Sequence, residues 1–169
     1  PVDLPTMSHS TMSYSAADVN NNGALEIFST DMKPYASDDE TRAAWQPLMD
    51  AMHDSDDAND DGQIPKNVLR ESDNSDLASD LGVDASGWSW SGKFGDLDQD
   101  GFVDLYIVNG MIEATTFAHL PEHELREENQ AYRNDGGSRF VPAPDWGLGS
   151  TESGRGMSLA DMDGDGDLD

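Results

Sequence analysis

Three nine-residue stretches of this chain place oxygen-bearing side chains on alternate residues of what reads as a tight turn. The central one, residues 96–104, reads DLDQDGFVD, with aspartate at positions 1, 3, 5 and 9 and glycine at position 6. Hard cations such as Ca²⁺ take six to eight oxygen ligands, and alternate carboxylates on one turn can converge on a single point. Gly101 allows the backbone to reverse without a clash from a Cβ atom. The spacing therefore predicts a calcium site.

The same pattern occurs upstream at residues 18–26 and again at residues 161–169. The predicted metal ligands, with a backbone carbonyl at position 7, are Asp18, Asn20, Asn22, Ala24 and Glu26; Asp96, Asp98, Asp100, Phe102 and Asp104; and Asp161, Asp163, Asp165, Asp167 and Asp169. The first loop has only two charged ligand side chains, whereas the central loop has four, so we expect weaker Ca²⁺ binding in the first. The chain as a whole is expected to bind two to three Ca²⁺ ions.

The residues that follow the loops indicate what kind of element holds them. An EF-hand loop needs glutamate at position 12 and flanking helices, but position 12 is Ser29 in the first loop and Ile107 in the second. Short apolar runs follow instead, at residues 27–28 and 105–108, as a buried strand would show. We therefore predict strand, metal loop, strand.

Further short motifs accompany these units, and together they resemble a known family. GWSWSG and LYIVNG flank the central loop at residues 87–92 and 105–110, and YRNDG and GRG follow at 132–136 and 154–156. The chain resembles FG-GAP/VCBS repeats, the integrin-α-like β-propeller blades. More narrowly, it is similar to bacterial secreted propellers of the cartilage acidic protein and ASPIC/UnbV group. The resemblance implies an all-β fold with helical insertions, built as a partial β-propeller. It also implies recognition, scaffolding or adhesion rather than catalysis.

An internal repeat supports this organisation, because Asp80 aligns with Asp145 and Asp96 with Asp161 at one constant offset. We predict a single partial propeller over 1–169. Its repeat units are 1–32, 67–110 and 130–169, and its insertions are 33–66 and 111–129. Propellers typically have four to eight blades, so we expect a fragment, or blades completed by other polypeptide segments or subunits.

Both insertions carry helical signals. Acidic residues at 38–40 could begin a helix. Pro47 would either kink this helix or end its first part. A second, short solvated helix is expected over residues 122–128, with Pro121 near its start. The acidic stretch 57–65 nearly repeats the loop pattern, but Pro65 stands where the last carboxylate should be, so an acidic solvated loop is the competing interpretation.

Composition restricts the partners. The formal net charge is −26, with 35 acidic and 9 basic residues, which disfavours nucleic acid and anionic membranes and attracts cations. A salt-adapted surface is an alternative source of this charge. The chain has no cysteine and no apolar run long enough for a transmembrane segment. We expect an extracytoplasmic protein, whether secreted, periplasmic or on the cell surface, with a protein or glycan ligand.

Other chemistry remains open at the sequence level. Trp88 and Trp90 share one face of a strand and could stack on sugars or pack between blades. His119 and His123 have the spacing of helical zinc ligands, but Pro121 lies between them and surface histidines are favoured. Acid pairs are abundant, so the alternative function is a carbohydrate-active propeller enzyme, either a hydrolase or a lyase.

Overall fold

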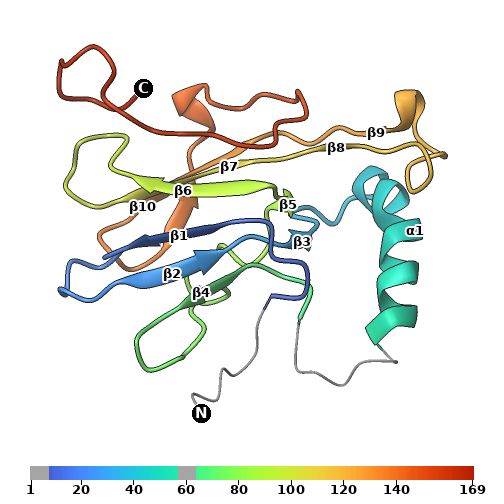
Figure 1. The fold of residues 1–169 in the computed structure, drawn as a ribbon, viewed down its shortest axis with the longest axis horizontal. Coiled ribbons are helices and arrows are strands. Elements are labelled where there is room, and N and C mark those ends of the chain that lie inside the picture. The colour runs from blue at the N-terminus through green and yellow to red at the C-terminus, as the bar shows by residue number, and fades with distance from the viewer. Residues whose placement is uncertain (1–7, 57–63) are drawn as a thin grey trace.

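The computed structural model describes residues 8–56 and 64–169, and strands dominate this part of the chain (Figure 1). The expected all-β class is confirmed: short antiparallel strands form the body, and one α-helix lies at one end. No closed propeller is formed by the described residues. In the same part of the chain, no helix has the length and apolar character that crossing a membrane requires.

The first sheet surrounds the first loop. Strands β1 (Tyr14–Ala17), β2 (Glu26–Ser29) and β4 (Val68–Arg70) pair antiparallel in the order β1-β2-β4. The loop at 18–26 connects β1 to β2, and the pair Ala17 and Glu26 closes its base. A bridge between Arg70 and Asp76 continues the sheet at its outer edge. The predicted strand–loop–strand unit is present here.

The second sheet has the same layout around the central loop. Strands β6 (Ser91–Gly95), β7 (Asp104–Val108), β10 (Gln130–Asn134) and β11 (Phe140–Pro142) form an antiparallel meander in the order β11-β10-β7-β6. Gly95 pairs with Asp104 at the base of the loop, as Ala17 pairs with Glu26 in the first sheet. The side chains of Leu105 and Ile107 on β7 are fully buried, which explains its apolar sequence.

The two sheets join where β1 lies alongside β6 (Figure 1). The backbone N–H groups of Gly92 and Phe94 on β6 donate to the hydroxyls of Ser13 and Ser15, at 3.0 and 3.2 Å. Serine side chains thus satisfy an edge that would otherwise present unpaired donors. The core beneath is shared by both sheets and consists of Val19, Phe28, Leu69, Ala78, Val83, Leu105, Ile107, Tyr132 and Phe140.

Helix α1 (Asp39–Asp56) begins as the sequence predicts, with Asp38 accepting hydrogen bonds from the Thr41 N–H and hydroxyl at 2.9 and 2.8 Å. Pro47 was expected to kink this helix or to end its first part, and the second alternative is wrong because the helix continues through Pro47 to Asp56. Trp45, only 1% exposed, fixes the helix to the body just before the proline. Tertiary packing therefore outweighs the one hydrogen bond that proline removes.

A second core cluster connects α1 to the sheets and consists of Met32, Trp45, Trp88, Phe117 and Leu125. Strands β3 (Met32–Lys33) and β5 (Gly87–Trp88) pair beneath it. The Trp88 ring centroid lies 6.2 Å from that of Trp45 and 5.4 Å from that of Phe117. Trp88 is therefore a packing residue within the chain, and its buried ring is not available to stack on a sugar.

The expected helix at 122–128 is not formed. Strands β8 (Met111–Ile112) and β9 (Glu124–Leu125) pair across a turn that contains only a three-residue 3₁₀ helix, η1 (Pro121–His123). Glu122 and His123 have φ angles of 53° and 57°, which interrupt any helical path. Leu125 is 2% exposed in the second cluster, so its burial favours the extended arrangement over a solvated helix.

The constant offset seen in the sequence corresponds to a repeated turn. Gly82 donates its N–H to the Ser79 carbonyl, and Gly147, which ends the 3₁₀ helix η2 (Pro144–Trp146), donates to the Pro144 carbonyl. Both glycines have positive φ, 80° and 70°, a conformation that other residues adopt with strain. These two segments thus share a backbone conformation as well as a sequence pattern.

Candidate metal centre

The three acidic loops lie at the same end of the molecule, away from α1 (Figure 1). The first and central loops touch, since the Asn21 side chain donates to the Gly101 carbonyl at 3.0 Å. The segment that carries the third loop packs on β6, where the side chains of Leu159 and Leu168 lie against Gly95. Three predicted sites that are far apart in sequence therefore form one acidic end.

Each loop is held by hydrogen bonds from its own backbone to its own side chains. In the central loop, Asp96 accepts the N–H of Asp100 at 3.1 Å and that of Gly101 at 3.0 Å. Asp98 accepts the same Asp100 N–H at 3.2 Å, and Asp100 accepts the Phe102 N–H at 2.8 Å. These bonds turn the backbone around the carboxylates, and Gly101 takes a φ of 92° to permit it.

The first loop repeats these bonds position for position. The third repeats them with one difference, because Asp161 accepts the N–H of Gly164 at 2.6 Å where the other two loops use the N–H of position 5. In the first, Asp18 accepts from Asn22 and Gly23 at 2.9 and 2.7 Å, and Asn22 accepts from Ala24 at 2.8 Å. In the third, the corresponding acceptors are Asp161 for Gly166 at 3.1 Å, Asp163 for Asp165 at 3.2 Å and Asp165 for Asp167 at 3.2 Å. The sequence pattern thus gives closely similar local geometry in all three loops.

Position 9 makes a contact that the sequence analysis did not anticipate. Its carboxylate reaches back to the backbone N–H of position 2 in every loop: Glu26 accepts from Val19 at 2.9 Å, Asp104 from Leu97 at 2.8 Å and Asp169 from Met162 at 2.8 Å. This bond closes the loop and places the last carboxylate beside the first ones. It explains why the carboxylate occurs at position 9 and not at position 12.

The closing carboxylates differ in burial. Glu26 is 1% exposed and Asp104 is fully buried, whereas Asp169 is exposed. Asp104 also accepts the N–H of Asn134 on β10 at 2.9 Å, a second buried donor from another strand. Burial raises the pKa of Asp104, because an ionised carboxylate is poorly solvated there, even though its two backbone donors act in the opposite direction.

In each of two loops, the spacing of the carboxylates fits one hard cation. Ligand oxygens of Asp96, Asp98 and Asp104 all lie within 4.8 Å of one another, and so do those of Asp161, Asp163 and Asp169. Oxygens bound to one Ca²⁺ at 2.3–2.6 Å are at most about 5 Å apart, so both groups could share one ion. Asp100 and Asp165 belong to neither group. The first loop offers only two acids, Asp18 and Glu26, with Asn20 and Asn22 between them.

Two residues on β10 support the central loop and were not identified from the sequence. The Asn134 side chain is buried and donates to the carbonyls of Val19 and Val103, at 2.7 and 3.0 Å, so it joins the first loop to the second. Its neighbour Arg133 places Nε 3.1 Å from a carboxylate oxygen of Asp98. The only signal for either was the YRNDG motif at residues 132–136, which contributed to the family resemblance.

Among the residues that the structure describes, the two histidines considered as zinc ligands do not form a metal site. His119 donates through Nε2 to the Ala44 carbonyl at 3.0 Å, and neither His119 nor His123 belongs to a group of converging ligands there. The acidic stretch 57–65 falls mostly outside the described residues, which resume at Ile64.

Comparison with known proteins finds a family match for one segment of the chain. Residues 123–169 match the family model of the FG-GAP-like repeat. No curated protein and no protein of solved structure matches the chain. The match covers β10, β11 and the third loop and little more than a quarter of the chain, so it shows an FG-GAP-like repeat at this position. It does not support the narrower resemblance to the cartilage acidic protein and ASPIC/UnbV group.

Proposed function

We propose that this protein is a calcium-stabilised β-repeat module in which Ca²⁺ has a structural role. The observation that carries the proposal is the repeated loop geometry, with three carboxylates within 4.8 Å of one another at 96–104 and again at 161–169. The loop at 18–26 has the same hydrogen bonds but fewer charges, and we assign it a weaker site. Every predicted ligand atom is an oxygen, which suits Ca²⁺ over softer metals.

The chemical argument is one of charge neutralisation. Carboxylates a few ångströms apart repel one another, and in a chain with a net charge of −26 there are few cations to offset them. A divalent ion removes this repulsion and fixes each hairpin loop between its two strands. Binding to the folded form alone would add about 2.7 kcal/mol per site at a hundredfold excess over Kd.

For the biological role we propose recognition or adhesion of a protein or glycan outside the cytoplasm. The FG-GAP-like repeat at residues 123–169 supports a propeller-type module, and recognition or adhesion is the role that we propose for it. Extracellular calcium modules bind with Kd values of about 10⁻⁴ to 10⁻³ M, so exposed loops such as 161–169 could be occupied there. A chain without cysteine would also gain stability from bound ions in place of disulfides.

The proposal is tested by thermal unfolding in EDTA, then in added Ca²⁺, then in Mg²⁺. We expect Ca²⁺ to raise the Tm by several degrees, with a smaller response to Mg²⁺, which demands a tighter octahedral shell. The double variant Asp98→Ala/Asp163→Ala should lose most of the response. The variant Asp80→Ala, which removes an exposed acid outside the loops, should keep it. Equal responses in both variants would contradict the assignment of the loops.

A further inference from the structure

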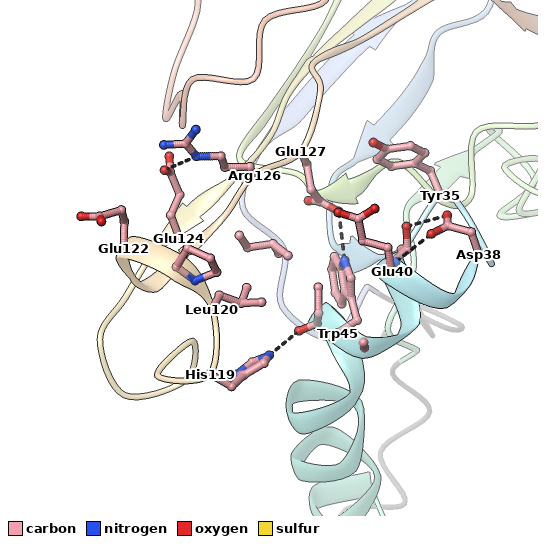
Figure 2. A pocket seen from close by; sticks show the side chains of 15 residues that line it. Tyr35, Asp38, Glu40, Trp45, His119, Leu120, Glu122, Glu124, Arg126 and Glu127 are labelled. Atoms are coloured by element: carbon pink, nitrogen blue, oxygen red, sulfur yellow. Dashed lines mark hydrogen bonds and ion pairs between the residues drawn. The ribbon is translucent and has the colours of Figure 1, made fainter.

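A second gathering of carboxylates surrounds a cavity at the opposite end of the molecule from the loops. The cavity, of about 910 Å³, lies between the first turns of α1 and the segment 119–127. Figure 2 shows Glu40 and Trp45 from α1 on one side and His119, Leu120 and Glu122 on the other. A volume of this size is typical of small-ligand sites. Neither the proposed calcium sites nor the FG-GAP-like repeat accounts for this cavity.

Hydrogen bonds hold the walls of the cavity in place. His119 Nε2 donates to the Ala44 carbonyl at 3.0 Å, which ties the 119–127 segment to α1. Glu127 accepts the indole N–H of Trp45 at 3.0 Å and the backbone N–H of Trp88 at 2.6 Å. Gly87 lies directly against this carboxylate, since a Cβ atom there would be 2.7 Å from a Glu127 oxygen. The cavity is therefore preformed, with Glu127 fixed in its wall.

The lining is strongly negative. It includes the carboxylates of Asp38, Glu40, Glu122, Glu124 and Glu127. Arg126 also lines the cavity, but its Nε is already 2.7 Å from a Glu124 oxygen. An anionic ligand would meet this charge unfavourably, whereas a cation would be attracted and retained.

These carboxylates are arranged differently from those of the loops. In the described part of the chain, no three acids of the cavity lie within 4.8 Å of one another, so they do not form a shell for one small ion. Between them lie apolar surfaces from Ala43, Ala44, Leu120, Pro121 and Leu125. Dispersed negative charge with apolar walls suits an organic cation that has an alkyl body.

Glu127 is the carboxylate to which such a cation would be the counter-ion. It is 5% exposed, its two hydrogen-bond donors are neutral, and no Lys or Arg among the described residues forms an ion pair with it. Burial raises its pKa to about 7. Of the other titratable groups that line the cavity, Tyr35 and the acids bring no positive charge. His119 is hydrogen-bonded to the Ala44 carbonyl, and Arg126 to the Glu124 carboxylate. A buried carboxylate without a counter-ion is costly, and an ammonium group would provide one.

We propose that this cavity binds an alkylammonium group, either a free amine or the lysine side chain of a protein. The ammonium pairs with Glu127, the exposed acids of the rim attract it, and the alkyl chain contacts Leu120 and Leu125. The proposal is independent of calcium at the loops, because the two sites share no residue.

Calorimetric titration of the whole chain tests it, at physiological salt and with excess Ca²⁺. The probe is n-butylamine, and 1-butanol is the neutral control of the same chain length. We expect saturable binding of the amine, none of the alcohol, and an affinity that rises between pH 6 and pH 8 as Glu127 loses its proton. A capped lysine peptide forms the second arm: tighter binding than butylamine indicates a protein ligand, and weaker binding indicates a free amine.

Three variants locate the binding. Glu127→Gln should weaken butylamine binding at least tenfold, and Glu40→Gln, at an exposed position on the rim, should weaken it severalfold without disturbing the fold. Glu152→Gln removes an equal charge outside the cavity and should leave the affinity unchanged. Equal weakening by all three variants, binding of the alcohol as strong as that of the amine, or no saturable binding would each overturn the proposal.

Discussion

The two ends of this molecule both collect carboxylates, but they arrange them in opposite ways. At the loop end, each of two loops brings the ligand oxygens of three acids within 4.8 Å of one another, and most of these acids are exposed. At the helix end, five acids surround a cavity of about 910 Å³ without converging, and one of them, Glu127, is buried. Figure 1 shows the loops and α1 at opposite ends of the sheets.

Acidic composition alone therefore does not define a site in this molecule. A small divalent ion needs several oxygens at one point, which a turn with alternate aspartates provides from within nine residues. A larger organic cation needs fewer charges and more apolar contact, which requires two elements to face each other. Distance between carboxylates therefore separates two kinds of cation chemistry in one acidic chain.

The largest effect is expected for Asp104→Ala in metal-free protein. Asp104 is buried and accepts the N–H groups of Leu97 and Asn134, so its loss leaves two donors without a partner. At about 1–3 kcal/mol for each, the free energy of unfolding should fall by about 4 kcal/mol. Urea denaturation in EDTA measures this change.

Asp169→Ala is the matched control, because Asp169 makes the same bond to Met162 in an exposed loop. Water can replace that acceptor, so we expect a loss within about 1 kcal/mol. Similar losses in the two variants would show that burial at position 9 does not distinguish the central loop from the third.

A smaller effect, dependent on pH, is expected at the helix end. Because burial raises the pKa of Glu127 to about 7, the folded protein holds this proton more tightly than the unfolded chain does. The stabilising contribution is therefore complete below about pH 4.5 and is lost as the pH rises to about 7. The loss should approach about 3 kcal/mol.

Urea denaturation of the wild type and Glu127→Gln across this pH range isolates the contribution. Glutamine does not titrate, so the variant should gain stability relative to the wild type as the pH rises from 5 to 7.5. The Glu152→Gln variant, at an exposed position, should follow the wild type. A constant difference between wild type and Glu127→Gln would show that Glu127 ionises normally in the folded protein.

The smallest expected effect concerns the first loop, which has the bonds of a metal site but only two acids. Asn20→Asp should increase its Ca²⁺ affinity about tenfold, equivalent to about 1.4 kcal/mol, by adding a charged ligand at position 3. Calcium titration in the Asp98→Ala/Asp163→Ala background reports this loop alone. Asn21→Asp adds the same charge at position 4, where no ligand is predicted, and an equal gain there would indicate general attraction by charge.

Several features were predictable because they depend on neighbouring residues. The three loops, the strands flanking the first two and the start of α1 at Asp38 follow from spacing, β-rich runs and capping chemistry. The predicted helix at residues 122–128, and the alternative that Pro47 ends the first part of α1, were wrong because the deciding contacts are distant. Trp45 fixes α1 through Glu127, and burial of Leu125 imposes an extended segment.

The loop geometry follows from local sequence, since each of the side-chain hydrogen bonds within a loop joins residues at most seven positions apart. The burial of one closing carboxylate depends instead on long-range packing, because Asp104 is bonded to Asn134, 30 residues away. Long-range packing also created the cavity, where Glu127 meets Trp45 across 82 residues and Trp88 across 39. Short-range patterns encode turns, whereas burial and the lining of a cavity depend on packing between distant segments.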